Sequence, residues 1–415
     1  MGKFIGCGHL DRPRAQSLMT AAGLEALLLV RPESIKYATG AEPGNATKGG
    51  RVGAAFVLVP ADADQPPAAI IGDYYADAFH EASQISDLRT IQIWVDTADI
   101  TRGVGTTVQE KLRSAAGPER SGRPATFDLG EGIRALQAIL DSRNLGSARI
   151  GIEYGFVPHL DALALQHFLP SVAWTDATKL VGRLRAVKSP DEISILTGAA
   201  MAAETGMKAI LGKLHPGATA QDLAVKWRAA TVADARRQFP NAVIDTWFSG
   251  AIGSNAWGPG KSIQEGDLIK LDVGCMIDGY SSDSARTFVS GEASPDARVL
   301  FSAIEEAHAQ ALDALRFGAE FREIHQVAMR SMQRSGFETY RRGHFGHSLG
   351  SDLFVEEWPF FDSRETEMIE PGMVLAVEVP WYVRGLGAVM IEDQVTVTHD
   401  SVSSLWTLDR SLVSI

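Results

Sequence analysis

Cysteine is scarce in this sequence, which carries only Cys7 and Cys275 in 415 residues. Two thiols so far apart exclude a disulfide framework or a thiolate zinc site, and they suit a reducing compartment. The sequence also lacks the roughly 18 consecutive apolar residues that a membrane span needs. Its first residues, MGKFIGCGHLDRPRAQ, lack the apolar core of a signal peptide. We therefore expect a cytoplasmic protein that does not enter a membrane.

An excess of positive charge is missing as well. The formal net charge of −12 disfavours nucleic acid or an anionic membrane surface as a partner. The composition, 45% hydrophobic and 22% charged, is typical of a soluble globular protein. Because 415 residues exceed the usual size of one hydrophobic core, we expect two domains.

The first part of the chain, 1–180, is predicted to be an α/β domain. Apolar β-rich runs alternate with helical patterns, such as the three-four spacing of Ile133, Leu136 and Leu140. This part carries no compact cluster of catalytic residue types. The expected strands are 26–30, 53–59, 68–72, 90–95 and 148–153.

A second domain, 181–415, is predicted to follow. Ser189 and Glu192 form an S-x-x-E capping box with Pro190 in the first turn, which predicts a helix running to about Leu214. Helices among antiparallel-type strands make this part α+β. Further helices are expected at 220–238, 295–317 and 321–334, and strands at 268–276, 280–289, 373–379 and 389–397.

The stretch KLDVGCMIDGYSSDSARTF predicts a β-hairpin that carries two acids on one face. Its apolar residues alternate with polar ones, so Asp272 lies on the polar face of the first strand. Asp278-Gly279 is a strong signal for a two-residue turn. That turn pairs Asp272 with Ala285 and makes Asp283 a diagonal neighbour of Asp272 on the same face.

Two carboxylates on one face repel each other unless they are protonated or bridged by a cation. Two solvated aspartates on an exposed face are the alternative. Glu378 and Glu392 also lie in apolar strands, EPGMVLAVEVP and VMIEDQVTV, where an unpaired acid is costly to bury. His347 adds an imidazole between glycines in GHSLG. Four carboxylates and one imidazole can hold two divalent cations about 3.5–4 Å apart.

These motifs, in this order, resemble the pita-bread metallohydrolase family of methionine aminopeptidase, prolidase, aminopeptidase P and creatinase. The signatures are LDVG…GYSSDSARTF, GHSLG, EPGMVLAVE and IEDQVTV. The two-domain members share a linker like LRAVKSPDEI and an N-terminal stretch like GLEALLLVRPESIKYATG. The resemblance covers nearly the whole chain. It implies an N-terminal creatinase-like α/β domain followed by a C-terminal pita-bread catalytic domain.

The resemblance also implies the metal ligands. Asp272 and Asp283 would bind one metal, and Asp283 and Glu392 would bridge to the second. His347 and Glu378 would complete the shell. The implied cofactor is two divalent metal ions, Mn, Co, Zn or Fe. A homodimer is implied by the two-domain relatives.

The family's reaction is attack of a metal-activated water on a carbonyl carbon. Glu378 would carry the proton to the leaving nitrogen. His344 competes with His347 for the ligand role, but only His347 is followed by the family's x-x-Gly. His344 is then expected beside the metal ligands.

The chain departs from the family's peptidases where they contact the substrate. Their histidine before the first aspartate is missing from FSGAIGSNAWGPGKSIQEGD, where Trp257 lies nearest. Glu356 takes the place of their second histidine, in SDLFVEEWP. Met390 stands where prolidases carry an arginine, for which Arg384 is a substitute.

The substrate contacts expected from the sequence are therefore Trp257, Trp358 and Arg384, with Glu356, His344 and Glu378 as the catalytic residues. Core packing is the alternative for both tryptophans. The glycines of 250–260 lack the lysine and helix of a phosphate loop, so we expect a loop that lines the substrate site.

The sequence thus predicts a dinuclear metal-dependent hydrolase that cleaves an amide or peptide-like C–N bond of a small substrate, similar to an Xaa-Pro dipeptidase. Two alternatives remain open. One is a metal-dependent lyase like the one that cleaves dimethylsulfoniopropionate, although that enzyme carries an extra aspartate where this chain has Gly274. The other is a binding module without catalytic activity.

Overall fold

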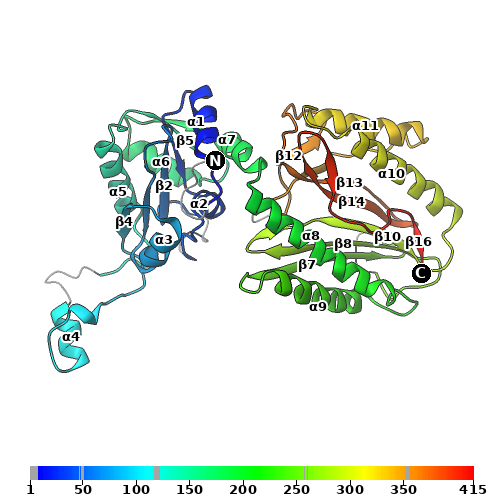
Figure 1. The fold of residues 1–415 in the computed structure, drawn as a ribbon, viewed down its shortest axis with the longest axis horizontal. Helices are drawn as coiled ribbons and strands as arrows, with labels where there is room; N and C mark the ends of the chain where they lie inside the picture. The colour runs from blue at the N-terminus through cyan, green and yellow to red at the C-terminus, as the bar shows by residue number, and fades with distance from the viewer. Residues whose placement is uncertain are drawn as a thin grey trace. The chain divides into compact units, whose positions relative to one another are not determined.

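The chain divides after Leu184 into two units, each with its own β-sheet, which we describe separately. The structure is a computed structural model that describes residues 8–45, 47, 51–115, 122–256, 258, 260–351 and 355–415. Figure 1 shows the first unit in blue to teal and the second in green to red. Within the described ranges, no helix is both long and apolar enough to cross a membrane.

The first unit is built on a mixed sheet of strand order β4-β3-β2-β1-β5-β6. Apolar clusters lie on both faces, one with α1, α2 and α7 and the other with α5 and α6. The strands are β1 (Ala26–Leu29), β2 (Ala55–Pro60), β3 (Ala68–Gly72), β4 (Asp87–Ile91), β5 (Arg149–Ile152) and β6 (Ala173–Asp176). The helices are α1 (Arg12–Ala21), α2 (Pro32–Thr39), α3 (Ala76–Ser83), α4 (Val108–Ala115), α5 (Leu129–Ser142), α6 (His159–Phe168) and α7 (Thr178–Ala186).

One predicted strand of this unit was misplaced, and β6 was not predicted. The apolar run 90–95 suggested a strand, but the edge strand is β4, which begins earlier at Asp87. The charged residues Asp87 and Arg89 interrupt the apolar pattern by which β4 could have been predicted. Asp87 forms an ion pair with Arg143 at 2.7 Å. Edge strands often carry such charges because one side of the strand is unpaired.

The second unit holds an antiparallel sheet of strand order β12-β11-β13-β14-β10-β8-β7. Its strands are β7 (Ile244–Ile252), β8 (Leu268–Ile277), β9 (Tyr280–Ser281), β10 (Ser284–Val289), β11 (His344–Ser348), β12 (Glu357–Asp362), β13 (Val374–Val383), β14 (Gly387–Val397), β15 (Val402–Ser404) and β16 (Val413–Ser414). Short β9, β15 and β16 pair with β8, β14 and β10.

Two pairs of helices pack on this sheet: α8 (Pro190–Leu211) with α9 (Ala220–Gln238), and α10 (Pro295–Ala314) with α11 (Phe321–Arg334). Figure 1 shows α8 and α9 along β7 and β8. The predicted capping box of α8 is present, with the Ser189 side chain accepting from Glu192 N and Glu192 accepting from Ser189 N. The α+β fold class is confirmed.

Strand alternation separates a helix-facing side of this sheet from an opposite side. Ile269, Leu271 and Val273 pack in the apolar cluster of α8 and α9. On β13, Leu375 and Val377 pack in the cluster of α10 and α11. The intervening residues of each strand therefore lie on the opposite face. The acids predicted as ligands are among these intervening residues.

Five strands of this unit were not predicted, namely β7, β11, β12 and the short β15 and β16, and one predicted strand was too long. β7, β11 and β12 carry glycine, proline or histidine, which weaken an apolar alternation. The strand predicted at 280–289 is two strands, because Ser282 and Asp283 leave the regular pairing. Ser282 instead pairs with Cys275 through N–H to O at 2.9 Å, and its Oγ accepts from Cys275 N at 3.0 Å.

A charged network is buried on the helix-facing side of β14. The Asp393 carboxylate is fully buried and accepts from Arg286 at 2.8 Å and from Arg410. His308 Nε2 lies 3.6 Å from it. Burial raises the pKa of Asp393, but the positive charges beside it, Arg286 first and then Arg410, outweigh burial and the pKa is lowered overall. Asp393 is therefore ionised and fixes β14 to β10 and α10.

We predict that Asp393→Asn lowers the free energy of unfolding by about 3–5 kcal/mol, because it leaves the buried guanidinium of Arg286 without its counter-charge. Urea unfolding followed by circular dichroism measures this change. Asp400→Asn, at an exposed turn residue, is the matched control and should stay within about 0.5 kcal/mol of the unmodified protein. Equal stability of the two variants would contradict the assignment.

Candidate metal centre

The hairpin of β8 and β9 has the register predicted from its turn. Asp278 and Gly279 both have positive φ, 51° and 90°, as a type I′ turn requires. Ile277 pairs with Tyr280, and further along Asp272 pairs with Ala285. This part of the prediction is confirmed.

One row of paired residues then crosses four strands. Asp272 pairs with Ala285, Ala285 with Glu392, and Glu392 with Glu378. Directly paired residues lie on the same face of a sheet, about 4.5–5.5 Å apart. Asp283 joins this row two residues before Ala285, where its N–H donates to Gln394 Oε1 at 3.3 Å. The four predicted carboxylates therefore share one face.

The histidine reaches this face through a break in β11. Gly346 has φ +127°, and a Cβ there would lie 2.0 Å from the Ala376 carbonyl oxygen, so only glycine fits. The break lets both His344 and His347 face the acids, three residues apart, while Phe345 packs in the core. His347 pairs with Ala376, two residues before Glu378.

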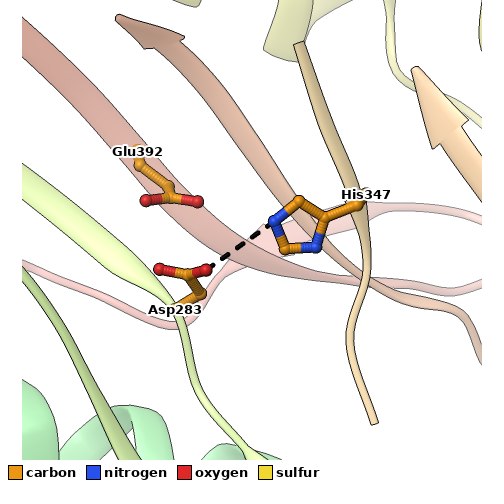
Figure 2. A group of neighbouring side chains, drawn as sticks. All are labelled: Asp283, His347 and Glu392. Carbon is orange, nitrogen blue, oxygen red and sulfur yellow. Dashed lines mark ion pairs between the residues drawn. The ribbon is translucent and has the colours of Figure 1, made fainter. Parts of the chain in front are cut away.

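Asp283, His347 and Glu392 form a compact cluster. Figure 2 shows the three side chains pointing toward one another from three separate segments. One ligand atom from each lies within 4.8 Å of the others, and His347 Nε2 is 3.6 Å from Asp283 Oδ2. All three are buried, at 7%, 1% and 1% exposure. The other ring nitrogen of His347, Nδ1, is 3.0 Å from the Ser348 carbonyl oxygen, which fixes the ring with Nε2 toward the acids.

The electrostatics of this cluster are unfavourable without a cation. Burial raises the pKa of Asp283 well above its usual range, and the charges of Asp272 and Glu378 raise it further. Burial and the charge of Asp283 likewise raise the pKa of Glu392. Burial lowers the pKa of His347 to about 4, so its imidazole is neutral near pH 7 and able to bind a metal.

Two buried oxygen atoms support a metal site. Within the part of the chain that the structure describes, Glu392 Oε2 and Asp272 Oδ1 are buried and receive no hydrogen bond. Buried polar atoms are nearly always partnered, so such atoms need an explanation. Carboxylate oxygens with one imidazole are a donor set for divalent transition metals. The residues present therefore fit the metal that the sequence predicted.

Asp272 and Glu378 each touch a cation of the protein. Lys270 Nζ donates to Asp272 Oδ2 at 3.1 Å, and Arg342 donates to Glu378 Oε1 at 2.8 Å. Sequence reasoning assigned neither cation a role. Lys270 carried a signal, because it shares the polar face of β8 with Asp272. No pattern marked Arg342, which is also held by a hydrogen bond from its Nε to the His344 carbonyl oxygen at 2.7 Å.

His344 and Glu356 lie at the edge of the cluster. His344 Nδ1 is 3.4 Å from Glu378 Oε1, and its Nε2 is 3.6 Å from Glu356 Oε2. Burial lowers the pKa of His344 and raises that of Glu356. The structure thus places His347 beside Asp283 and His344 beside Glu378. Phe360, which sequence reasoning missed, packs against the His344 ring at 5.3 Å.

The predicted substrate residues have different outcomes. Trp257 lies outside the described residues. Trp358 is half-buried on β12, on the strand face of Phe360, and its indole N–H donates to Glu365 at 2.6 Å. Arg384 is exposed in the turn between β13 and β14. That turn meets the predicted substrate loop, since Gly385 N donates to the Ser254 carbonyl at 3.0 Å.

Gly274 cannot be replaced by the extra aspartate of the lyase without rearrangement. A Cβ there would lie 2.2 Å from Trp247 Nε1 and 2.3 Å from the Ser282 carbonyl oxygen. Trp247 covers Gly274 from β7 and is held by a hydrogen bond to Ser281 at 3.1 Å. The packing of Trp247 therefore excludes, at position 274, the extra aspartate that the lyase carries.

A buried cluster of carboxylates and one imidazole on one face of an antiparallel sheet is a ligand set typical of metal-dependent hydrolases. Residues 194–399 match the model of metallopeptidase family M24, and residues 12–187 match that of the creatinase/prolidase N-terminal domain. The chain belongs to metallopeptidase family M24 and is a metal-dependent peptidase, which confirms the family and the enzyme class expected from the sequence.

Known relatives extend over both units. The chain is 28% identical over 266 residues to an Xaa-Pro dipeptidase of Lactobacillus helveticus, covering 61% of this chain and 70% of the relative. It is 25% identical over 274 residues to an Xaa-Pro dipeptidase of Pyrococcus horikoshii, covering 65% and 76%. The solved Xaa-Pro dipeptidase from Bacillus anthracis has the same fold, with a TM-score of 0.75, 22% identity and coverage of 97% and 99%.

We predict that metal binding releases protons and strengthens as pH rises. The folded, metal-free site holds protons because the pKa values of Asp283 and Glu392 are raised, and a divalent cation needs both groups ionised. His347 contributes no proton above about pH 5, because its pKa is lowered to about 4. Calorimetric titration in buffers of different ionisation enthalpy counts the released protons. An affinity that stays constant between about pH 6 and about pH 8 would contradict the predicted charge state.

Proposed function

We propose that the chain is a two-metal hydrolase that cleaves an amide or peptide-like C–N bond of a small substrate, with an Xaa-Pro dipeptide as the first candidate. The observation that carries the proposal is Glu392 Oε2, an acid oxygen buried in an apolar strand without a partner among the described residues. The printed activity of the relatives, Xaa-Pro dipeptidase, supports the substrate class. Two divalent cations supply a Lewis acid and an activated water when bound.

The ligand assignment follows the row of paired residues. Asp283, Glu392 and His347 are proposed to hold one cation, and Asp272 the second, with the two buried acids Asp283 and Glu392 shared between them. Glu378 is proposed as a further ligand of the first cation, the one held by Asp283, Glu392 and His347. Manganese, cobalt, iron and zinc all suit this oxygen-rich set with one nitrogen.

Glu378 is proposed to move the proton from the attacking water to the leaving nitrogen. Its Oε1 accepts a hydrogen bond from Arg342, which orients the carboxylate. Burial raises the pKa of Glu378, and Arg342 opposes this rise. A carboxyl group with a raised pKa suits the role of accepting and then donating a proton.

His344 and Glu356 are proposed to connect Glu378 with solvent. Glu378 has 5% of its side chain exposed and Glu356 has 34%, with the His344 ring between them. The Gly346 N–H points at His344 Nδ1 at 3.4 Å, which favours the ring proton on Nε2, toward Glu356. Contacts of 3.4–3.6 Å between these groups shorten with small side-chain rotations.

Substrate contacts are proposed at the rim of the site. Trp257, Trp358 and Arg384 remain candidates. The turn that carries Arg384 meets the predicted substrate loop, since Gly385 N donates to the Ser254 carbonyl oxygen. The homodimer and the cytoplasmic location expected from the sequence also remain predictions.

The test is a panel of Xaa-Pro dipeptides, other dipeptides, N-acyl amino acids and small betaines, assayed with added manganese, cobalt, zinc or iron. We expect hydrolysis of an amide substrate that depends on metal. Asp283→Ala should abolish turnover and lower the bound metal, while circular dichroism stays unchanged. Unaltered turnover in this variant would remove the site assignment.

The two sequence-based alternatives are outcomes of the same panel. Elimination products from a betaine would indicate the lyase reaction instead of hydrolysis. The packing of Trp247 on Gly274 disfavours the lyase, because it leaves no space for the lyase's extra aspartate. A protein that neither binds a divalent metal nor turns over any substrate would be a binding module.

Arg342→Gln should lower kcat by about 10- to 100-fold with little change in metal content, because residues that orient metal ligands have effects of this size. The lost contact is the guanidinium bond to Glu378 Oε1. Arg341→Gln is the matched control, since Arg341 is exposed and bonds only to nearby carbonyls in the described structure. Equal activity of both variants would show that Arg342 does not position Glu378.

A further inference from the structure

Trp247 carries an indole on the face of the sheet where the proposed metal ligands lie. It pairs with Gly274, two residues after Asp272 on β8. A Cβ on Gly274 would lie 2.2 Å from Trp247 Nε1, so the indole shares the face of Asp272 and Gly274. Trp247 is half-buried, and in the described part of the second unit it belongs to none of the apolar clusters. Core packing therefore does not account for its position.

Hydrogen bonds hold the indole in one orientation. Trp247 Nε1 donates to Ser281 Oγ at 3.1 Å, and Ser281 Oγ donates in turn to the Ser282 carbonyl oxygen at 3.1 Å. Because Gly274 has no side chain, the ring lies across β8 and reaches from β7 to β9. A rigid aromatic ring of this kind offers a large contact surface and loses little conformational entropy when a ligand binds.

An exposed acid lies next to Trp247 on the same face of β7. Thr246 faces the helices, since Arg228 of α9 donates to its Oγ1 at 2.9 Å. Strand alternation then turns Asp245 and Trp247 to the opposite face, about 6.6 Å apart along the strand. Asp245 pairs with Met276 and is therefore the more distant of the two from the metal centre. Within the described residues, its side chain accepts a hydrogen bond from Thr246 N at 2.7 Å and has no ion pair.

We propose that Trp247 and Asp245 form a subsite for a basic side chain of the substrate, that of lysine or arginine. This inference rests on the proposed hydrolase function and adds to it the class of substrate. The scissile bond lies at the metal ligands beside Asp272, the stem of the basic side chain crosses the indole, and its charged end reaches Asp245.

Lysine and arginine match this arrangement because both parts of their side chains find a partner. Their apolar stems pack on apolar surface while the charged end stays in water. Trp247 and the half-buried Met276 supply that surface, and the face of an indole also attracts a cation. Asp245 supplies the opposite charge at the exposed end of the subsite.

Other side chains lack one or both of these contacts. Norleucine has the stem of lysine without the ammonium group, so it gains only the contact with Trp247. Alanine is too short to reach the indole. Glutamate brings a second negative charge toward Asp245 and is repelled. The expected order of preference is therefore lysine, norleucine, alanine and glutamate.

A kinetic comparison of Xaa-Pro and Xaa-Ala dipeptides tests the subsite, with Xaa as lysine, norleucine, alanine or glutamate. For the unmodified chain with added manganese, we expect kcat/KM to be about 3- to 10-fold higher for lysine than for norleucine, since an exposed ion pair and a cation over an indole together have effects of this size. The advantage of lysine should decline as salt is added, because salt screens the charge of Asp245.

Two variants separate the roles of the indole and the acid. Trp247→Ala should lower kcat/KM about tenfold for the lysine and norleucine substrates and less than about threefold for alanine, because it removes the surface on which the stem packs. Asp245→Asn should remove the advantage of lysine over norleucine and leave the norleucine value unchanged. Trp94→Ala and Asp400→Asn, at exposed residues, are the matched controls and should keep the order of preference.

Three outcomes would overturn the subsite. The first is equal turnover of lysine and norleucine substrates by the unmodified chain, or faster turnover of norleucine. The second is a uniform loss for all substrates in Trp247→Ala, which would assign Trp247 a structural role. The third is an unchanged advantage of lysine in Asp245→Asn. Asp245 is exposed, so this variant should fold even if Trp247→Ala does not.

A binding measurement separates this inference from the proposed function. If the unmodified chain hydrolyses no dipeptide with any added metal, the proposed function fails. Calorimetric titration with lysinamide and norleucinamide then tests the subsite without catalysis. We expect tighter binding of lysinamide, lost in Asp245→Asn, and equal binding of the two amides by the unmodified chain would overturn the subsite.

Discussion

The electrostatic cost of bringing Asp283 and Glu392 together is the constraint on which the rest of the site depends. Both acids are buried, and burial raises the pKa of each. The charges of Asp272 and Glu378 raise the pKa of Asp283 further, and the charge of Asp283 raises that of Glu392. Neither can be moved independently, since Glu392 lies in the row of paired residues that joins β8, β10, β14 and β13. The sheet therefore holds two charges at a distance that only protonation or a cation makes favourable.

Helix packing on the other face of the sheet fixes this arrangement. Leu271 and Val377 are buried against the two helix pairs, and a slip of one residue would turn them toward the site and the acids toward the core. The register is thus maintained by apolar burial far from any ligand. Gly346 adds an irregularity that the site needs, because Phe345 before it packs in the core while His347 after it faces the acids.

Much of this could be predicted from the sequence because the signals are local. The Asp278-Gly279 turn predicted the pairing of Asp272 with Ala285, and α9 and α11 begin and end at the predicted residues. Arg342 could not be predicted, since it lies before β11, outside any strand, and contacts Glu378 36 residues further along the chain. β7 and β11 were missed because their glycines interrupt the apolar alternation on which strand prediction depends.

Two neighbouring acids on β14 show why a bound metal is the better explanation of the unpaired oxygen. Asp393 faces the helices and is neutralised by Arg286 and Arg410. Glu392, one residue earlier, faces the other side, where its Oε2 has no partner among the described residues. Arg286 reaches the backbone carbonyl of Glu392 at 2.8 Å. A guanidinium is therefore close to both residues, yet the fold directs its charge to one acid only, and the other is left to a cation from outside the chain.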